Sequence, residues 1–274
     1  MHNKLIQIPI LIVFCILACC APCFCQKMEL ALSKPINGIN LTSVDSQGNI
    51  FISKKDGEII KINQRGELLL NYSPSKTGNV KQIDVWSPFK IATYYDSFQE
   101  MVVLNRFLSE TVRYNFDDFN LGFVSNASLN FQQNLWVIDE SDFSLKLLDM
   151  MNGDILVNQP FFTFLNVDDH DITFIKEYQN QLYVVDVEFG ILIFDNLGNL
   201  INQLEIKGIQ SLGFEKDTYY YHNKNSLLVR GIYSSDELII NLPKSNYQDV
   251  KKFENYFYCS SPNQLDIYRY LREE

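Results

Sequence analysis

The chain has almost no cysteine after its first 25 residues. Five of its six cysteines are Cys15, Cys19, Cys20, Cys23 and Cys25, and the sixth is Cys259. If the first 25 residues are removed, no internal disulfide can form. Cys259 ends the apolar segment 256–259, so we expect it to be a buried structural thiol and not a nucleophile.

The chain also lacks basic blocks and a second long apolar run. Its formal net charge is −10, and no run of three or more consecutive Lys or Arg occurs. Nucleic acid is therefore not an expected partner, because the electrostatic attraction to phosphates is missing. After residue 26 no apolar run approaches the ~20 residues of a membrane-spanning helix, so we predict no transmembrane segment in the mature chain.

Familiar catalytic motifs are missing as well. The mature chain has no Gly-x-Ser-x-Gly elbow, Cys-x-x-Cys pair, phosphate-binding glycine loop or His-Glu-x-x-His motif. Once His2 is removed, His170 and His222 are the histidines that remain. These absences predict a protein that is not an enzyme, has no catalytic residues and holds neither a cofactor nor a resident metal.

What the chain has in abundance is aromatic residues, with 20 Phe and 15 Tyr. Aromatic and β-branched side chains pack well on the pleated surface of a sheet, whereas alanine, a strong helix former, is sparse here. The composition therefore predicts an all-β protein with little helix.

Residues 1–25 have the pattern of a signal peptide. Lys4 supplies a positive start, and the run Leu5 to Ala21 is almost wholly apolar. Two processing routes remain open: cleavage before Gln26, which we favour, or lipid attachment at Cys19 after a lipobox-like sequence. We expect residues 26–274 to form one domain outside the cytoplasm, periplasmic or secreted, with an outer-membrane lipoprotein as the alternative.

A repeat of about 40 residues organises the rest of the chain. Six short aromatic or branched segments each predict one strand, and each is followed by a turn and a second apolar segment. A further turn, such as Asn63-Gln64-Arg65-Gly66, leads to an outer strand, and glycine or asparagine there permits the positive φ of a tight hairpin. We call the first of these strand segments in each unit its anchor segment. With one further strand ahead of each anchor segment, every unit becomes a four-stranded antiparallel meander. The six anchor segments are 49–53, 89–93, 134–138, 181–185, 218–221 and 256–259.

Six such units predict a six-bladed β-propeller. The last unit ends near Leu271 and lacks its outer strand. Residues 28–34 alternate as a strand should, so we predict that they pair with the segment around 264–271 and close the ring. Five or seven blades remain open, because the second unit is irregular around Trp86-Ser87-Pro88.

Two of the units carry a resemblance to a known family. The segment from Asp45-Ser46-Gln47-Gly48 through Gly66-Glu67-Leu68-Leu69 resembles an NHL-type repeat, and residues 182–198 give a second copy. The whole chain is similar to a family of exported propellers of Bacteroidetes bacteria. The resemblance implies a fold and a compartment but no particular chemistry.

Acidic residues collect in the predicted turns between the second and third strands of the blades. These turns share one face with the connections between blades, and their carboxylates predict an acidic mouth. It could receive a basic partner or hold Ca²⁺ through oxygen ligands, although a hydrated loop rim is the simpler interpretation. The binding residues that we predict on this face are Trp86, Tyr95, Asp139, Glu140, Asp186 and Glu188.

The segment Asp168-Asp169-His170-Asp171 has metal-ligating residue types, but consecutive strand residues point to opposite faces, so a turn is the favoured interpretation. We therefore predict a monomeric binding or scaffolding module of the bacterial cell envelope, whose partner is an envelope protein or a small ligand. The alternative is a metal-dependent lactonase or esterase, since some six-bladed propellers hold a central cation.

Overall fold

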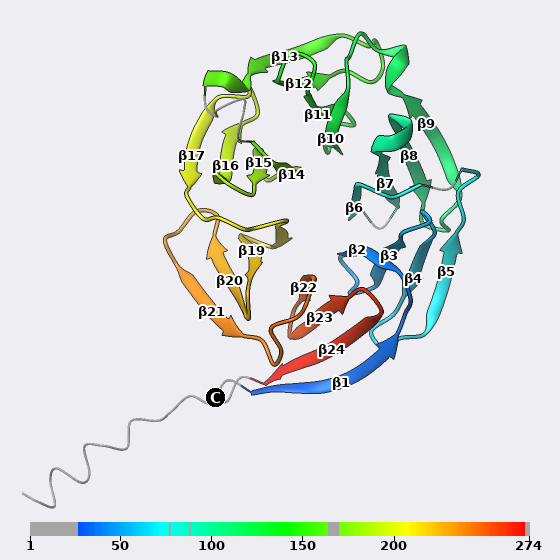
Figure 1. Ribbon diagram of the computed structural model, residues 1–274, viewed down its shortest axis with the longest axis vertical. Helices are drawn as coiled ribbons and strands as arrows, with labels where there is room; N and C mark the ends of the chain where they lie inside the picture. Colours follow the sequence, from blue (N-terminus) through cyan, green and yellow to red (C-terminus); the bar gives the residue numbers. More distant parts are fainter. Residues whose placement is uncertain (1–26, 77, 88, 164–169, 272–274) are drawn as a thin grey trace, which may run out of the picture.

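The computed structural model describes residues 27–271, apart from residues 77, 88 and 164–169. Residues 1–25, where the signal peptide is predicted, lie outside this range. Six sheets of four antiparallel strands stand around a common axis (Figure 1). The predicted all-β, six-bladed propeller is confirmed, and the five- and seven-bladed alternatives are excluded.

Each of the first three blades is a meander of four consecutive strands. Blade 1 is β2 (Ile39–Val44), β3 (Ile50–Lys54), β4 (Ile59–Ile62) and β5 (Leu68–Tyr72). Blade 2 is β6 (Gln82–Ser87), β7 (Lys90–Tyr95), β8 (Glu100–Asn105) and β9 (Glu110–Asn115). Blade 3 is β10 (Val124–Leu129), β11 (Leu135–Asp139), β12 (Ser144–Leu148) and β13 (Ile155–Pro160).

The remaining blades repeat this order. Blade 4 is β14 (Ile172–Tyr178), β15 (Gln181–Asp186), β16 (Gly190–Asp195) and β17 (Leu200–Leu204). Blade 5 is β18 (Gly213–Glu215), β19 (Thr218–Asn223), β20 (Ser226–Gly231) and β21 (Glu237–Asn241). Blade 6 is β22 (Asp249–Phe253), β23 (Tyr256–Ser261), β24 (Gln264–Leu271) and, from the other end of the chain, β1 (Lys27–Pro35). Three short 3₁₀ helices complete the described elements: η1 (Asp96–Phe98), η2 (Phe116–Asp118) and η3 (Phe161–Thr163).

The ring closes between the two ends of the chain. Strand β1 pairs antiparallel with β24, from Lys27 opposite Leu271 to Pro35 opposite Gln264, with one irregularity between Leu30 and Leu32. The pairing covers the edge that β24 would otherwise expose. This confirms the predicted closure by the N-terminal strand.

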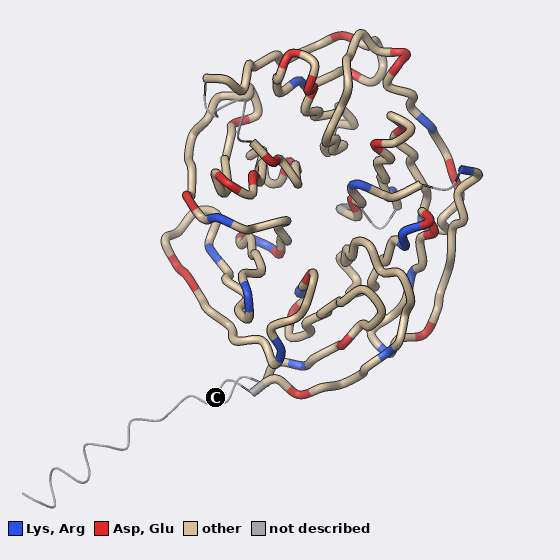
Figure 2. The backbone as a smooth tube through the Cα atoms, in the orientation of Figure 1, with Lys and Arg blue, Asp and Glu red and all other residues tan. Residues whose placement is uncertain are grey.

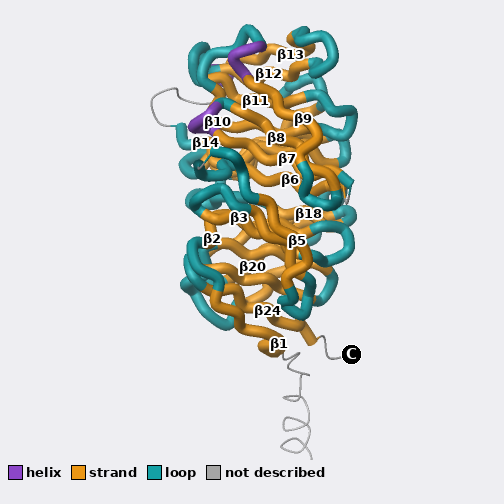
Figure 3. The backbone as a smooth tube through the Cα atoms, turned by 90° about the vertical axis from the view of Figure 1, so that its right-hand side faces the viewer, coloured by secondary structure: helices purple, strands orange, loops and turns teal. Residues whose placement is uncertain are grey.

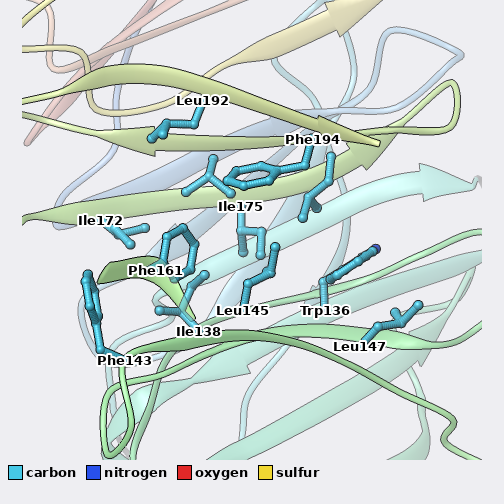
Figure 4. Close-up of a cluster of buried hydrophobic side chains, with 12 residues drawn as sticks. Trp136, Ile138, Phe143, Leu145, Leu147, Phe161, Ile172, Ile175, Leu192 and Phe194 are labelled. Atoms are coloured by element: carbon cyan, nitrogen blue, oxygen red, sulfur yellow. The ribbon is translucent and has the colours of Figure 1, made fainter. Parts of the chain in front are cut away.

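The hydrophobic core lies between blades and not within them. The middle strands are buried along almost their whole length, because each of their two faces packs on a neighbouring blade. Between blades 3 and 4, for example, Trp136 and Leu145 pack with Ile175 and Phe194 (Figure 4). A comparable cluster fills each of the other five junctions. Cys259 belongs to one of them and is fully buried, as expected.

Loops gather on the two opposite faces of the ring (Figure 3). The connection face carries the turns between the second and third strands of each blade, together with the connections between blades. The hairpin face carries the turns between first and second strands and between third and fourth strands. In the described part of the chain, no helix is long and apolar enough to cross a membrane.

Candidate functional site

A channel along the propeller axis forms a cavity with a volume of about 920 Å³. It is lined by the innermost strands of five blades, β2, β6, β14, β18 and β22, and by the residues that lead into them. Its lining extends from Asp96 and Ser97 on the connection face to Ser46 and Lys216 on the hairpin face. The size is in the usual range for a small-molecule site.

Strand registers place polar residues of five of the six blades at one level of this axis. In each blade, the inner-strand residue at this level pairs with the middle of the second strand. Ser43 pairs with Phe51 in blade 1, and Lys176 pairs with Tyr183 in blade 4. This level therefore brings together side chains that are far apart in the sequence. Its polar members are Ser43, Asp84, Ser128, Lys176 and Lys251, and blade 5 has Gly213 at the equivalent position.

A first buried charge pair spans blades 2 and 4. The Nζ of Lys176 forms an ion pair with Asp84, and the hydroxyl of Ser128 in blade 3 donates to the same carboxylate at 2.9 Å. Asp84 is only 3% exposed. A charge this far from water requires such partners, so these three residues stabilise one another at the side of the channel.

A second charged group joins blades 5, 6 and 1. Asp249 accepts a hydrogen bond of 2.7 Å from Thr42, and its other oxygen lies 3.1 Å from the Nζ of Lys251. The ammonium group of Lys251 also donates to the hydroxyl of Ser211 at 3.2 Å. Each of these two ammonium groups thus lies beside a carboxylate. The lining also includes Lys81, Lys216 and Lys252 among its Asp and Glu residues, so it has no large region of a single charge.

The wider charge pattern agrees with this description. Lys and Arg are interspersed with Asp and Glu around the ring (Figure 2). Charges of opposite sign also meet near the hairpin end of the channel, where Lys252 forms an ion pair with Glu215. Electrostatic recognition in the channel would therefore depend on individual side chains and not on an overall field.

Two buried polar atoms in the lining have unused hydrogen-bonding capacity. The amide nitrogen of Gln82 donates to the carbonyl of Ile175 at 2.5 Å, but its Oε1 has no partner among the described residues. The same is true of the hydroxyl of Thr173. Buried polar atoms are nearly always hydrogen-bonded, so these two atoms of channel-lining residues are exceptions, and a small side-chain rotation would turn either one toward a polar molecule in the channel.

Apolar side chains complete the lining. Leu41, Phe174 and Phe214 lie along the same cavity as the charged pairs. The wall is thus of mixed character and has more polar and charged side chains than the mainly apolar wall that is usual for a small-molecule site. The arrangement suits a molecule that has both apolar and hydrogen-bonding parts.

The predicted loop-face residues are not a single exposed cluster. Tyr95 is 2% exposed and packs in the core between blades 1 and 2, where its hydroxyl donates to the carbonyl of Gly57. Trp86 falls within β6, near the hairpin face and thus at the opposite end of the blade from Tyr95. The side chain of Trp86 is outside what the structure describes.

The two predicted aspartates are interior residues. Asp186 accepts three backbone N–H groups, those of Asp171, Glu188 and Phe189, at 2.8–2.9 Å. Asp139 forms an ion pair with Lys146 at 2.6 Å and accepts from the backbone of Gly122. Both carboxylates shape their own turns and, contrary to expectation, do not belong to an exposed rim.

Burial of Asp139 by itself raises the pKa of its carboxyl group. The hydrogen bonds from Lys146, Gly122 and Ser141 outweigh that effect and bring the pKa below its ordinary value. The carboxylate therefore stays ionised, and its charge is balanced inside the protein.

The two predicted glutamates remain partly accessible. The carboxylate of Glu140 lies 3.0 Å from the ring of His170, and Glu188 forms an ion pair of 3.2 Å with Lys207. The side chain of Glu188 is 53% exposed, whereas that of Glu140 is 26% exposed. Of the four acidic binding residues predicted on this face, these two are the ones that solvent can reach.

The structure does not favour the metal-dependent alternative. Within the described residues, no three His, Cys, Asp or Glu side chains come together as potential metal ligands. Asp168 and Asp169 of the predicted turn lie outside the described residues. A lactonase or esterase built on a central cation thus gains no support from this geometry.

Sequence reasoning missed the channel residues. A lysine or aspartate within a predicted innermost strand was the available signal, as at Lys176 or Asp84, because such strands surround the axis of a propeller. The reasoning was directed at acidic turns instead, where Asp139 and Asp186 have structural roles.

Comparison with known proteins identifies the fold but no family. No protein-family model and no curated protein matches the chain. Virginiamycin B lyase from Staphylococcus aureus matches 89% of this chain and 99% of its own, with 11% identity and a TM-score of 0.63. A streptogramin B lyase matches 90% and 98%, with 11% identity and a TM-score of 0.65. The β-propeller domain of Cps50 (Swd1) from Myceliophteria thermophila matches 89% and 99%, with 10% identity and a TM-score of 0.60.

These comparisons contradict the prediction that the protein is not an enzyme. Two of the solved structures that share its fold are lyases. The motifs whose absence led to the prediction belong to hydrolases, redox proteins and phosphate-binding proteins, so their absence does not exclude catalysis on this fold. At 11% identity the likeness shows the fold alone and transfers no reaction to this chain.

Proposed function

We propose that the protein is exported and binds a small molecule in its axial channel. The observation that carries the proposal is the cavity of about 920 Å³, whose lining includes Gln82 and Thr173 with unused hydrogen-bonding atoms. A ligand with a donor group for Gln82 Oε1 and an apolar portion against Phe174 would use both kinds of surface.

The charged pairs would orient such a ligand. The ammonium groups of Lys176 and Lys251 are already neutralised by Asp84 and Asp249. A ligand without formal charge would leave both pairs intact, whereas a charged ligand would have to displace a buried partner at considerable cost. The proposed ligand is therefore polar but uncharged.

Export is part of the proposal and rests on residues 1–25, with either cleavage before Gln26 or lipid attachment at Cys19. The NHL-type repeat and the envelope location belong to the same proposal, supported by the repeat residues already described. The channel lining reaches both faces, with Asp96 and Ser97 on the connection face and Ser46 and Lys216 on the hairpin face. A partner that approaches the connection face would meet Glu140 and Glu188.

The channel proposal is tested by filling the cavity. A panel of uncharged small molecules is screened by thermal shift against the purified protein, and Ser43→Phe is then compared with the wild type. Ser43 lines the channel and is partly exposed, so the larger ring should occupy ligand space while the fold remains. We expect the thermal shift given by a hit to disappear, which corresponds to a loss of affinity of at least about a hundredfold.

The matched control is Ser109→Phe, at an exposed turn on the hairpin face. It should bind each hit as the wild type does. Mass spectrometry of the recovered compound distinguishes simple binding from conversion. Hits that bind equally well to Ser43→Phe would place the ligand outside the channel.

A further inference from the structure

The turns between third and fourth strands share one local structure on the hairpin face. In four blades an Asn or Asp side-chain oxygen accepts the backbone N–H of the residue two positions later, at 2.8–2.9 Å. This hydrogen bond closes an Asx turn, and the later residue stands at its tip. The pairs are Asn63 with Arg65, Asn105 with Phe107, Asp149 with Met151, and Asp195 with Leu197.

Three of the four tip side chains are apolar, although the fold does not require an apolar residue at these positions. Phe107, Met151 and Leu197 are 59%, 93% and 63% exposed, and none belongs to a buried core cluster. Only their backbone N–H groups are used by the turn, so any polar residue would serve the fold equally well. Exposed large apolar side chains that recur in this way indicate an interaction surface.

More apolar residues lie on the same face. Phe89, Phe131 and Tyr233 stand in other turns there and are all exposed. On the connection face, the exposed large apolar side chains of the described residues are Phe123 and Phe162. The two faces of the ring therefore differ, and the hairpin face is the more apolar one.

The chain also enters the propeller on the hairpin face. Lys27 pairs with Leu271 at the end of β24, next to the turns of that face. Residues 1–26 precede Lys27 and contain the apolar run from Leu5 to Ala21. With a lipid on Cys19, one of the two processing routes, residues 20–26 would be the whole tether. Such a short tether would hold this face, and not the connection face, against a bilayer.

We propose that the hairpin face rests on a membrane surface, with the tip residues Phe107, Met151 and Leu197 inserted into the interface between headgroups and acyl chains. The inference is separate from ligand binding in the channel. Arg106 stacks on the ring of Phe107 at 4.6 Å, and the side chain of Arg65 is 79% exposed at the equivalent tip of blade 1. Both guanidinium groups would contact lipid phosphates.

The spacing of the tips favours a bilayer over a protein partner. Each apolar tip belongs to a different blade and is separated from the next by polar turn residues such as Asn152 and Asn196. A stable protein interface needs a continuous, well-packed patch. A fluid interface accommodates separate side chains, because each one enters on its own.

The test uses the chain expressed with its own N-terminal segment and recovered after processing by a bacterial host. Met151→Trp places a fluorophore at a tip, and Phe123→Trp places one on the connection face as the matched control; the emission of the wild type, which contains Trp86 and Trp136, is subtracted from that of both variants. We expect vesicles of phosphatidylethanolamine and phosphatidylglycerol to shift the emission of Met151→Trp to shorter wavelength and to leave that of Phe123→Trp unchanged. A shift in both variants, or in neither, overturns the proposal.

A second measurement gives the contribution of the tips. The triple variant F107S/M151S/L197S should partition to the same vesicles about a hundredfold less than the wild type, because three apolar side chains no longer enter the interface. The control F123S/F162S should partition normally. A lipid on Cys19 would hold any variant on the vesicle, so mass spectrometry of the N-terminus decides which readout applies: partition for an unlipidated chain, fluorescence for a lipidated one.

These experiments would also detect two other occupants of the hairpin face. A second copy of the chain would give self-association in sedimentation that the triple serine variant abolishes, and that result overturns the proposal. A protein partner would leave the wild type unbound to protein-free vesicles, which overturns it equally. The thermal melt of the triple variant should match that of the wild type, because the tips contact no core cluster.

Discussion

At the scale of single residues, the same side-chain type has opposite roles depending on its surroundings. Asp139 is the last residue of β11, and Glu188 lies in the turn that follows β15 of the next blade. Asp139 is 1% exposed and balances the charge of Lys146, whereas the side chain of Glu188 is 53% exposed. A buried ion pair costs far more to break than an exposed one contributes.

Asp139→Ala should therefore lower the free energy of unfolding by about 3–5 kcal/mol, because Lys146 would lose its buried partner. Glu188→Ala should change it by less than about 0.5 kcal/mol. Urea denaturation of the two variants beside the wild type measures both values. If Asp139→Ala and the wild type had equal free energies of unfolding, Asp142, which also contacts Lys146 at 2.8 Å, would fully compensate for the lost carboxylate.

At the scale of strands, the closing pair depends on one buried carboxylate. Asp266 in β24 accepts hydrogen bonds from Ser33 of β1 at 2.5 Å, from Lys244 at 2.6 Å and from Tyr247 at 3.0 Å. Burial raises the pKa of Asp266, but the hydrogen bond from Lys244 and those from Ser33 and Tyr247 outweigh it, so the pKa lies below the ordinary value. The ionised form thus stabilises the junction between the two ends of the chain.

This carboxylate should make stability depend on acid. Because its pKa is lower in the folded state, its contribution is complete above the unfolded pKa of about 3.9 and is lost as the pH falls through the folded pKa. Asp266→Asn should be less stable than the wild type by about 2–4 kcal/mol at pH 7. That difference should shrink in increasingly acidic solution.

Denaturation at a series of pH values measures the Asp266 effect. Glu29→Gln is the matched control, since Glu29 is exposed on the same strand pair, and it should behave as the wild type throughout. If the free energies of unfolding of the wild type and Asp266→Asn differed by the same amount at every pH, the effect would come from packing and not from charge.

At the scale of the whole molecule, stability requires a closed ring. Each blade buries its faces only against its neighbours, so the last junctions depend on β1 covering β24. Leu32 and Met28 of β1 also pack against the core clusters on the two sides of blade 6. Loss of this strand removes backbone pairing and apolar burial together.

Deletion of residues 26–34 should lower the melting temperature by at least ~10 °C, since several kcal/mol are lost in a domain for which 1 kcal/mol corresponds to about 2–4 °C. Differential scanning calorimetry measures the change. A synthetic peptide of residues 27–35 should restore part of it by pairing with β24. An unchanged melt would mean that the edge of β24 needs no partner.

The sequence by itself determined the four-stranded meander and the closure by residues 28–34, and it favoured six blades while five and seven remained open. These features depend on local patterns: the alternation of side chains along a strand, the residues that permit tight turns, and a missing last strand. Each can be recognised within one unit of about 40 residues.

Only the tertiary structure decided which residues meet at the axis and which acidic residues are buried. Asp84 and Lys176 form an ion pair although 92 positions separate them, and no local pattern encodes that distance. Asp139 and Glu188 occupy similar turns, but their exposure depends on what packs over them. Burial and partnership arise when blades close into a ring, because each blade supplies only one wall of every cavity and core.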